Sequence, residues 1–194
     1  MKKLATSIFC FILVIGALNA QSTAKFNLKV GYSVFQIADE DGIFENRSHT
    51  TQHAGFDVLI EKNNWLFIPG FHYYRIGLEP EDFKTSELFS KRPYGNFAKM
   101  PISFGYHFRQ TPVISFSAYG GGSANFFLRV DENDSGLTND RFKGIHLNAH
   151  IGAQILIVNH ITVDFLYEHG FMPIYKTRDE SKISGFTLSL GFVF

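Results

Sequence analysis

Histidine is the residue type in this sequence best suited to chemistry, and the chain contains eight of them. Ser48, His49 and His53 lie close together, and Glu168 and His169 form a second polar group nearer the end of the chain. A serine hydroxyl becomes nucleophilic when a histidine base contacts it within about 3 Å. These residue types therefore raise the hypothesis of acyl transfer. The alternative is a solvated polar surface without catalytic activity.

A metal site is the other chemistry that histidines could support, and His146 and His150 are the pair to consider. They share one face of an alternating pattern, where four strand residues span roughly 13 Å. One metal ion cannot bridge that distance without a ligand from a third strand, so the sequence predicts no metal site and no cofactor. The glycine run at 120–122 is not a phosphate-binding loop, because no Lys-Ser/Thr pair and no helix follow it.

The elements that carry these side chains are predicted to be β-strands, because apolar and polar residues alternate along most of the chain. The pattern is clearest at 141–157, where Ile145 and Leu147 share one face and His146 and His150 the other. The third strand is apolar on both sides, so its inward face is not assigned. Eight strands are predicted, at about 25–37, 51–61, 65–77, 96–109, 113–129, 141–157, 161–170 and 183–194.

The connections between the predicted strands alternate in length. Those after the first, third, fifth and seventh strands have about eleven to eighteen residues and are polar, whereas the others have about three. Outer-membrane barrels show this alternation because their turns are tight on one side of the membrane and their loops long on the other. Greek-key connections of a β-sandwich would not sort loops this way. The predicted fold is an all-β, eight-stranded, antiparallel up-and-down transmembrane β-barrel.

The interior of such a barrel would receive the polar faces of the strands, with the apolar faces toward lipid. An eight-stranded barrel has an interior just wide enough for side chains to fill it. An unpaired buried charge is very costly, so charged residues there should form pairs. The sequence thus predicts a plugged, charge-paired interior rather than a pore. The predicted network consists of Lys29, Asp57, Lys99, His107, Arg129, His146, His150, Asp164 and Glu168.

The start of the chain is predicted to be a targeting segment. Lys2 and Lys3 precede an apolar run that ends near the small residue Ala20, which is typical of a secretory signal peptide. The predicted organisation is therefore a signal peptide at 1–20 and a barrel domain at 21–194, located in the outer membrane of a Gram-negative bacterium.

The composition is consistent with this assignment. The chain has 22 Phe and 8 Tyr but one cysteine, which lies inside the predicted signal peptide, so no disulfide can stabilise the mature domain. No later stretch has the roughly 18 apolar residues of a membrane helix. The formal net charge is zero, and no basic patch suggests a nucleic-acid partner.

The last strand carries a second signal. Thr187, Ser189, Phe192 and Phe194 resemble the C-terminal pattern read by the barrel assembly machinery, in which a polar residue and a glycine precede two alternating aromatics. Ser189 stands where glycine is usual. The resemblance implies that the assembly machinery is a partner of this chain, and the apolar strand faces predict contact with outer-membrane lipid.

The whole mature sequence resembles the small outer-membrane β-barrels of Bacteroidetes-type bacteria, the PorT-like family, which is related in architecture to OmpA and OmpX barrels. The third strand departs from the usual pattern in being heavily aromatic, with Phe67, Phe71, Tyr73 and Tyr74. Some members of that family are linked to a protein-secretion system, and membership alone does not define an activity. The resemblance rests on residues 29–31, 100–102, 144–147, 152–154 and 167–171.

Four functional hypotheses follow. The leading one is a monomeric, non-enzymatic outer-membrane protein that acts structurally or binds a protein partner through its outer loops, such as 78–94 with its acidic, basic and aromatic residues. A component or assembly factor of a secretion system is implied by the resemblance alone. A lipid-modifying enzyme that uses a rim histidine is the third hypothesis, and a pore is the fourth.

Overall fold

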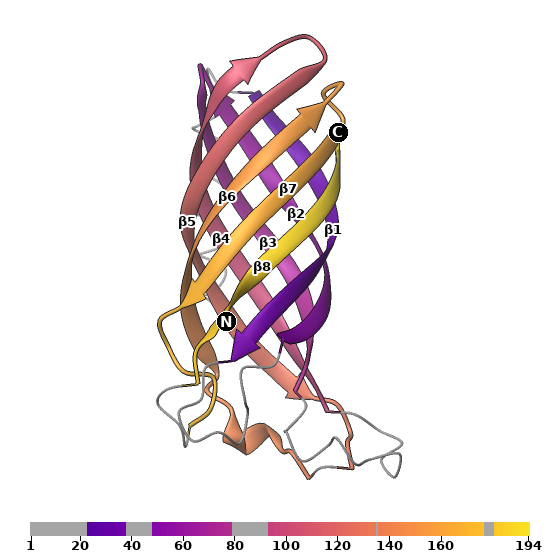
Figure 1. Cartoon of the computed structure of the whole chain (residues 1–194), viewed down its shortest axis with the longest axis vertical. Coiled ribbons are helices and arrows are strands. Elements are labelled where there is room, and N and C mark those ends of the chain that lie inside the picture. The colour runs from indigo at the N-terminus through magenta and orange to yellow at the C-terminus, as the bar shows by residue number, and fades with distance from the viewer. Residues whose placement is uncertain (1–22, 38–47, 79–92, 135, 177–180) are drawn as a thin grey trace, which may run out of the picture.

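The computed structural model describes residues 23–37, 48–78, 93–134, 136–176 and 181–194, and it forms one closed antiparallel β-barrel (Figure 1). The predicted fold class is therefore confirmed. The predicted signal peptide lies outside the described residues. The strands are β1 (Thr23–Ile37), β2 (Ser48–Lys62), β3 (Trp65–Gly77), β4 (Tyr94–Gln110), β5 (Ile114–Val130), β6 (Ile145–Ile157), β7 (Ile161–Gly170) and β8 (Ile183–Val193).

Every strand pairs with its neighbours in the sequence, and β8 returns to pair with β1. This last pairing runs from Asn27 opposite Val193 to Ile37 opposite Ile183. Closure leaves no sheet edge with unpaired backbone groups, which is the condition for a strand-built protein to be stable in an apolar environment.

The two ends of the barrel differ in their connections (Figure 1). We call the end with the tight connections after β2, β4 and β6 the turn end, and the end with the long connections after β1, β3, β5 and β7 the loop end. The C-terminus lies at the turn end, where the backbone N–H of Phe194 donates to the carbonyl of Phe26 over 2.8 Å. The predicted alternation of long and short connections is thus present.

Strand boundaries agree with the sequence prediction to within about three residues, except at β6. The strand was expected from 141 but begins at Ile145. Residues Asn139–Arg141 form a short 3-10 helix instead, and Phe142 makes an isolated β-bridge with Tyr175. Local alternation alone does not distinguish such a folded loop from an extension of the strand.

The outer surface of the barrel is apolar along most of its height. The strands expose one face each, as in β1 with Phe26, Leu28 and Val30 and in β8 with Leu188 and Leu190. The opposite faces are buried and mainly polar. This is the reverse of a water-soluble barrel and matches a surface that lies in lipid.

Aromatic side chains stand at the turn end of the outer surface. Trp65 is 66% exposed and packs edge-on against Tyr106, with ring centroids 5.3 Å apart. An aromatic ring with a polar atom is favoured at the boundary between lipid and water. Within the described residues, no helix is both long and apolar enough to cross a membrane.

The glycine run of β5 was predicted to bend the strand or to admit a neighbour. Gly121 does the latter, because a Cβ atom at this position would collide with the backbone of Ile102 and Ser103 in β4. The run therefore allows β4 and β5 to approach closely on the inner side of the barrel.

Candidate functional site

The interior of the barrel is organised around Lys29 of β1. Its ammonium group lies 2.7 Å from Oδ2 of Asp57 and 3.0 Å from Oδ1 of Asp164. All three side chains are at most 7% exposed. The inward alternation of β1, β2 and β7 brings them together, since Asn27 pairs with Asp57 and the next inward position of β1 is Lys29.

The two carboxylates around Lys29 also form hydrogen bonds with other side chains. His72 Nε2 lies 2.8 Å from Asp57, while Tyr119 and Gln154 donate to Asp164 over 3.2 and 2.9 Å. A buried carboxylate needs such donors in addition to one counter-charge. Lys29 and these hydrogen bonds together therefore stabilise both buried carboxylates.

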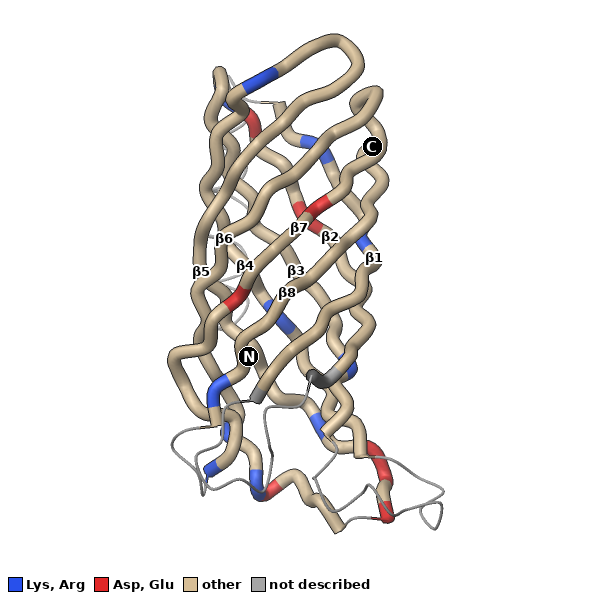
Figure 2. The backbone as a smooth tube through the Cα atoms, viewed as in Figure 1, with Lys and Arg blue, Asp and Glu red and all other residues tan. Residues whose placement is uncertain are grey.

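A second ion pair joins Lys99 of β4 to Glu168 of β7, nearer the loop end. Asn148 donates a hydrogen bond to the same carboxylate, and the Lys99 ammonium lies 5.0 Å from the ring centroid of Tyr74. Both charged side chains are 3% exposed. Two residues far apart in the sequence thus form an ion pair across the middle of the barrel. A few charged residues are visible along the backbone at this height (Figure 2).

Between these two clusters lies a cavity of about 40 Å³, lined by residues of both. His53, His72 and His150 line it, and within the described chain the Nδ1 atom of each has no hydrogen-bond partner. Oδ2 of Asp164 is in the same situation. A cavity of this size with polar walls has room for a few water molecules, which would supply these bonds.

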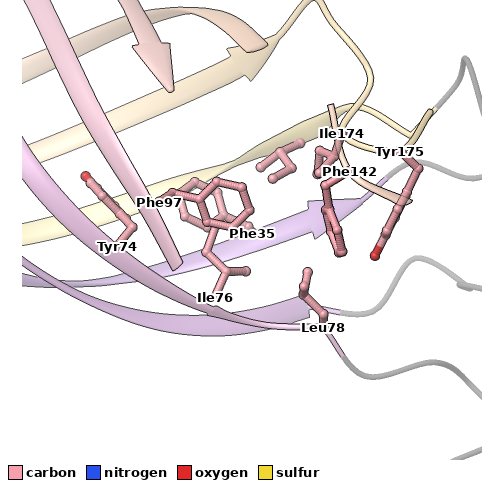
Figure 3. Packing of buried hydrophobic residues seen from close by; sticks show 9 residues of the cluster. Phe35, Tyr74, Ile76, Leu78, Phe97, Phe142, Ile174 and Tyr175 are labelled. Atoms are coloured by element: carbon pink, nitrogen blue, oxygen red, sulfur yellow. The ribbon is translucent and has the colours of Figure 1, made fainter. Parts of the chain in front are cut away.

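The loop end of the barrel is sealed by apolar side chains. Phe35, Ile76 and Phe97 gather inside the mouth, with Phe142 and Tyr175 beside them on the loop side (Figure 3). We call this cluster the aromatic cap. The ring of Phe142 stacks on Phe127 at 4.5 Å and contacts Tyr175 at 5.0 Å. The full cap comprises Phe35, Tyr74, Ile76, Leu78, Phe97, Phe142, Ile174, Tyr175 and Ile183.

The three predicted interior histidines are buried but have separate surroundings. His107 accepts or donates a 3.2 Å hydrogen bond with Ser115 near the turn end. His146 packs its ring edge against Phe97, and His150 bonds to Ser103 over 2.6 Å. In the described part of the chain, no group of three or more His, Cys, Asp or Glu side chains could hold a metal ion.

Arg129 is the one predicted interior residue that the structure places elsewhere. Its side chain is 72% exposed, and its Nε atom lies 3.8 Å from Asp131. The reason is a register shift between β4 and β5, which pairs Asn96 with Arg129 but Phe97 with Phe127. One extra residue, Leu128, reverses the alternation, so the prediction of an inward Arg129 was wrong.

The Ser-His groups expected at the rim are separated by the strand geometry. His53 points inward, where it stacks on Tyr74 at 4.6 Å and bonds to Ser189 over 3.2 Å. Glu168 also points inward, toward Lys99, whereas the adjacent His169 points outward. The side chains of Ser48 and His49 lie outside what the structure describes.

A serine that sequence reasoning missed does contact a rim histidine. Ser184 Oγ lies 2.8 Å from Nδ1 of His169, on the outer surface at the loop end. The two residues are register partners of β7 and β8. Alternation predicts that each faces outward, but it does not give the register of a hairpin with a long loop, so the pairing could not be found from the sequence.

The C-terminal residues divide between the two faces of β8. Thr187 and Ser189 point inward, with Thr187 2.7 Å from Ser33. Phe192 and Phe194 point outward and are 48% and 67% exposed. The polar pair and the aromatic pair are therefore available on opposite sides of the strand.

Comparison with known proteins places this geometry in a family. A family model described as an outer membrane protein beta-barrel domain matches residues 7–194. The search of curated proteins finds no match. The structural likenesses are to other small barrels, and at these identities they concern the fold alone.

Neisserial surface protein A shares 12% sequence identity and a TM-score of 0.57, over 89% of this chain and 99% of that one. The outer membrane enzyme PagL shares 13% identity and a TM-score of 0.52, over 86% and 97%. Ail of Yersinia pestis shares 18% identity and a TM-score of 0.49, over 88% and 99%. Since the family model spans nearly the whole chain, the protein belongs to the outer membrane protein β-barrel family.

Proposed function

We propose that this outer-membrane protein acts through its exterior, as a rigid anchor whose outer loops bind a protein partner. The observation that carries the proposal is the filled interior, in which two buried ion-pair clusters leave a cavity of about 40 Å³ under an apolar cap. A solute has no route through such an interior. The outer surface and the loops are then the parts of the molecule through which it can act.

The described residues of the connection between β5 and β6 support a binding role, because side-chain hydrogen bonds hold several of them to the backbone. Asn133 bonds to the backbone at both Asp131 and Leu137, and Asn139 accepts a 2.8 Å bond from the backbone of Val130. Phe142 fastens the far end to the aromatic cap. A loop ordered before binding loses less conformational entropy when a partner binds.

The test replaces residues 132–138 by a short Gly-Ser linker, which keeps Phe142 and every residue of the cap but removes the contact that Leu137 makes with it. Crosslinking on intact cells, followed by purification of the full chain, should recover a partner with the native protein and not with the variant. A matched control replaces the turn-end residues 111–112 by Gly-Gly and should keep the partner. Equal recovery with all three proteins would refute the proposal.

A second candidate function, hydrolysis or transfer of an acyl ester, is favoured by the Ser184–His169 contact. A nucleophile and a base within 2.8 Å on the outer surface satisfy the first geometric requirement of acyl transfer. The apolar side chains of Tyr167 and Phe186 lie directly on the turn-end side of this pair. An ester of a membrane lipid is therefore the substrate class that fits.

The experiment for this candidate compares the lipid A mass profile of cells with and without the protein. Loss of an acyl chain that depends on both Ser184 and His169, and not on His160 at the turn end, would support it. An identical lipid A profile in the presence and absence of the protein would exclude it.

A narrower membership in the PorT-like group remains part of this proposal. It is supported by the sequence patterns at 29–31 and 167–171, and a link to protein secretion depends on it. Unchanged secretion after deletion of the gene would remove that link. Insertion by the assembly machinery and a monomeric state are proposed on the C-terminal pattern and the closed sheet.

A further inference from the structure

Two exposed arginines lie on the outer surface at the loop end of β3 and β5. Arg75 and Arg129 flank Asn96 across β3, β4 and β5; the arginines are exposed on the outer face, whereas Asn96 is buried beneath its neighbours. The side chains of Arg75 and Arg129 are 52% and 72% exposed. Charged positions gather at this end of the barrel (Figure 2).

Arg75 is held by hydrogen bonds, and Arg129 forms a longer ion pair with the same carboxylate. Nε and Nη2 of Arg75 donate to Asp131 over 3.2 and 2.9 Å, and Asn96 donates to the same carboxylate over 2.8 Å. Arg129 approaches that carboxylate to 3.8 Å, and the guanidinium of Arg75 lies 4.2 Å from the ring centroid of Tyr94. Two guanidinium groups therefore approach one carboxylate, and together they carry one more positive charge than it neutralises.

A groove in the apolar surface leads to this position. It lies over β8, β1, β2 and β3, where the small Ala54 is surrounded by Val30, Tyr73 and Leu190. Two adjoining hollows of about 650 and 660 Å³ share these four residues. Arg75 lines the hollow toward the loop end, whereas the other hollow ends among phenylalanines.

We propose that this groove and the two arginines bind one phosphorylated lipid of the outer leaflet. An acyl chain lies over Ala54 between Val30 and Tyr73, and the phosphate contacts Arg75 and Arg129. Arginine suits phosphate because its planar fork donates two parallel hydrogen bonds. Basic side chains at a membrane surface attract anionic headgroups in the same way.

The groove distinguishes a lipid from a soluble anion. Its walls are mostly apolar and face the membrane, with Gln52 and Arg75 at the loop end, so most of the groove offers nothing to free phosphate. The charge stands at the end of the groove nearest the aqueous phase, where a headgroup would lie. A protein strand is a poor fit for this surface, because β1, β2 and β3 already pair with their neighbours in the closed sheet.

The test titrates the folded full chain in detergent with monophosphoryl lipid A or its dephosphorylated form, and counts bound lipid by native mass spectrometry. The phosphorylated lipid should bind more tightly. Arg75→Gln and Arg129→Gln should each weaken it about fivefold, with little effect on the dephosphorylated form. Arg109→Gln is the matched control, because Arg109 is exposed on the outer face at the turn end.

The groove is tested separately by Ala54→Phe, which fills it and leaves both arginines in place. Each methylene displaced should weaken binding of both lipids about fourfold. Heat-dependent gel mobility verifies that every variant is folded. The headgroup site would be overturned by equal binding of the two lipids, by equal weakening in Arg109→Gln, or by competition from millimolar inorganic phosphate. The groove would be overturned if Ala54→Phe bound both lipids as well as the unaltered protein does.

Discussion

Each charge inside this barrel depends on a partner that lies on another strand. Lys29 is neutralised by Asp57 and Asp164, and Lys99 by a glutamate 69 residues away. A charge removed from water is stable only when its partner and its remaining hydrogen bonds are all in place. Removal of a single member should therefore cost far more than removal of a similar residue at the barrel mouth.

Lys29→Met is expected to lower the free energy of unfolding by about 3–5 kcal/mol, because it leaves two buried aspartates without a counter-charge. Lys25→Met is the matched variant, since Lys25 pairs with Glu61 at 3.1 Å but is 25% exposed. This change should cost no more than about 1 kcal/mol. Urea unfolding in phospholipid vesicles, followed by the fluorescence of Trp65, measures both.

Neutralising the acids should restore part of the loss. Lys29→Met combined with Asp57→Asn and Asp164→Asn is expected to be more stable than Lys29→Met alone. If Lys29→Met and Lys25→Met prove equally stable, the interior network does not contribute as its burial implies.

The sequence predicted which types of residue lie inside the barrel, but it did not predict which of them contact one another. Alternation identified Asp57, Asp164 and Glu168 as inward, because facing follows from the period of a strand. It left out His72, which belongs to a strand that is apolar on both sides, and it placed Arg129 inside. A β-bulge changes which face of the sheet the following side chains occupy, and the local alternation of apolar and polar residues does not reveal it.

At the scale of the strands, the tight turns impose unusual backbone conformations. The turn from β6 to β7 has φ of 49° at Val158 and 59° at Asn159. A β-branched residue is disfavoured at positive φ, whereas asparagine adopts this conformation readily. In this turn Asn159 therefore suits its positive φ, whereas Val158 does not.

Val158→Asn should raise the free energy of unfolding by about 1 kcal/mol, by relieving this conformation. Val158 is 57% exposed, so little packing is lost. Val113→Asn is a suitable comparison because Val113 is equally exposed in the neighbouring turn without a positive φ. The same urea titration applies, and an equal change in both variants would argue against backbone strain as the cause.

The last strand is expected to serve assembly as well as closure. Removal of Phe194 should reduce the amount of folded barrel in cells severalfold, as measured by heat-dependent gel mobility of outer-membrane fractions. Refolding of the purified chain into detergent should be nearly unaffected, since the loss is limited to two backbone hydrogen bonds with Phe26 and one ring contact with Phe192 on the exposed face. Phe186→Ala, an outward change in the same strand, should assemble normally. Parallel losses in cells and in detergent would indicate a stability defect instead.

At the scale of the whole molecule, the barrel is closed along its axis at two levels. The aromatic cap covers the loop end, and the ion pairs of Lys99 and Lys29 lie beneath it. The hydrogen-bonded sheet fixes the width of the interior, so these side chains cannot separate without breaking the barrel. The interior is therefore filled by side chains except for a small polar cavity between the two ion-pair clusters.

No stepwise conductance is expected when the purified protein is inserted into planar lipid bilayers. Phe142→Ala with Tyr175→Ala should also remain silent, because the Lys99–Glu168 pair still blocks the interior. Steady single-channel steps from the unaltered protein would contradict a filled interior. Steps that arise only in the double variant would assign the block to the cap alone.

The sequence by itself determined the number of strands, their approximate limits, the apolar exterior and the polar interior. These features follow from the two-residue period of a strand and from the alternation of loop lengths, which are local. Only the tertiary structure decided which side chains meet, because register and bulges set contacts between distant strands. The Lys29 network, the Ser184–His169 contact and the outward Arg75 and Arg129 all depend on that register.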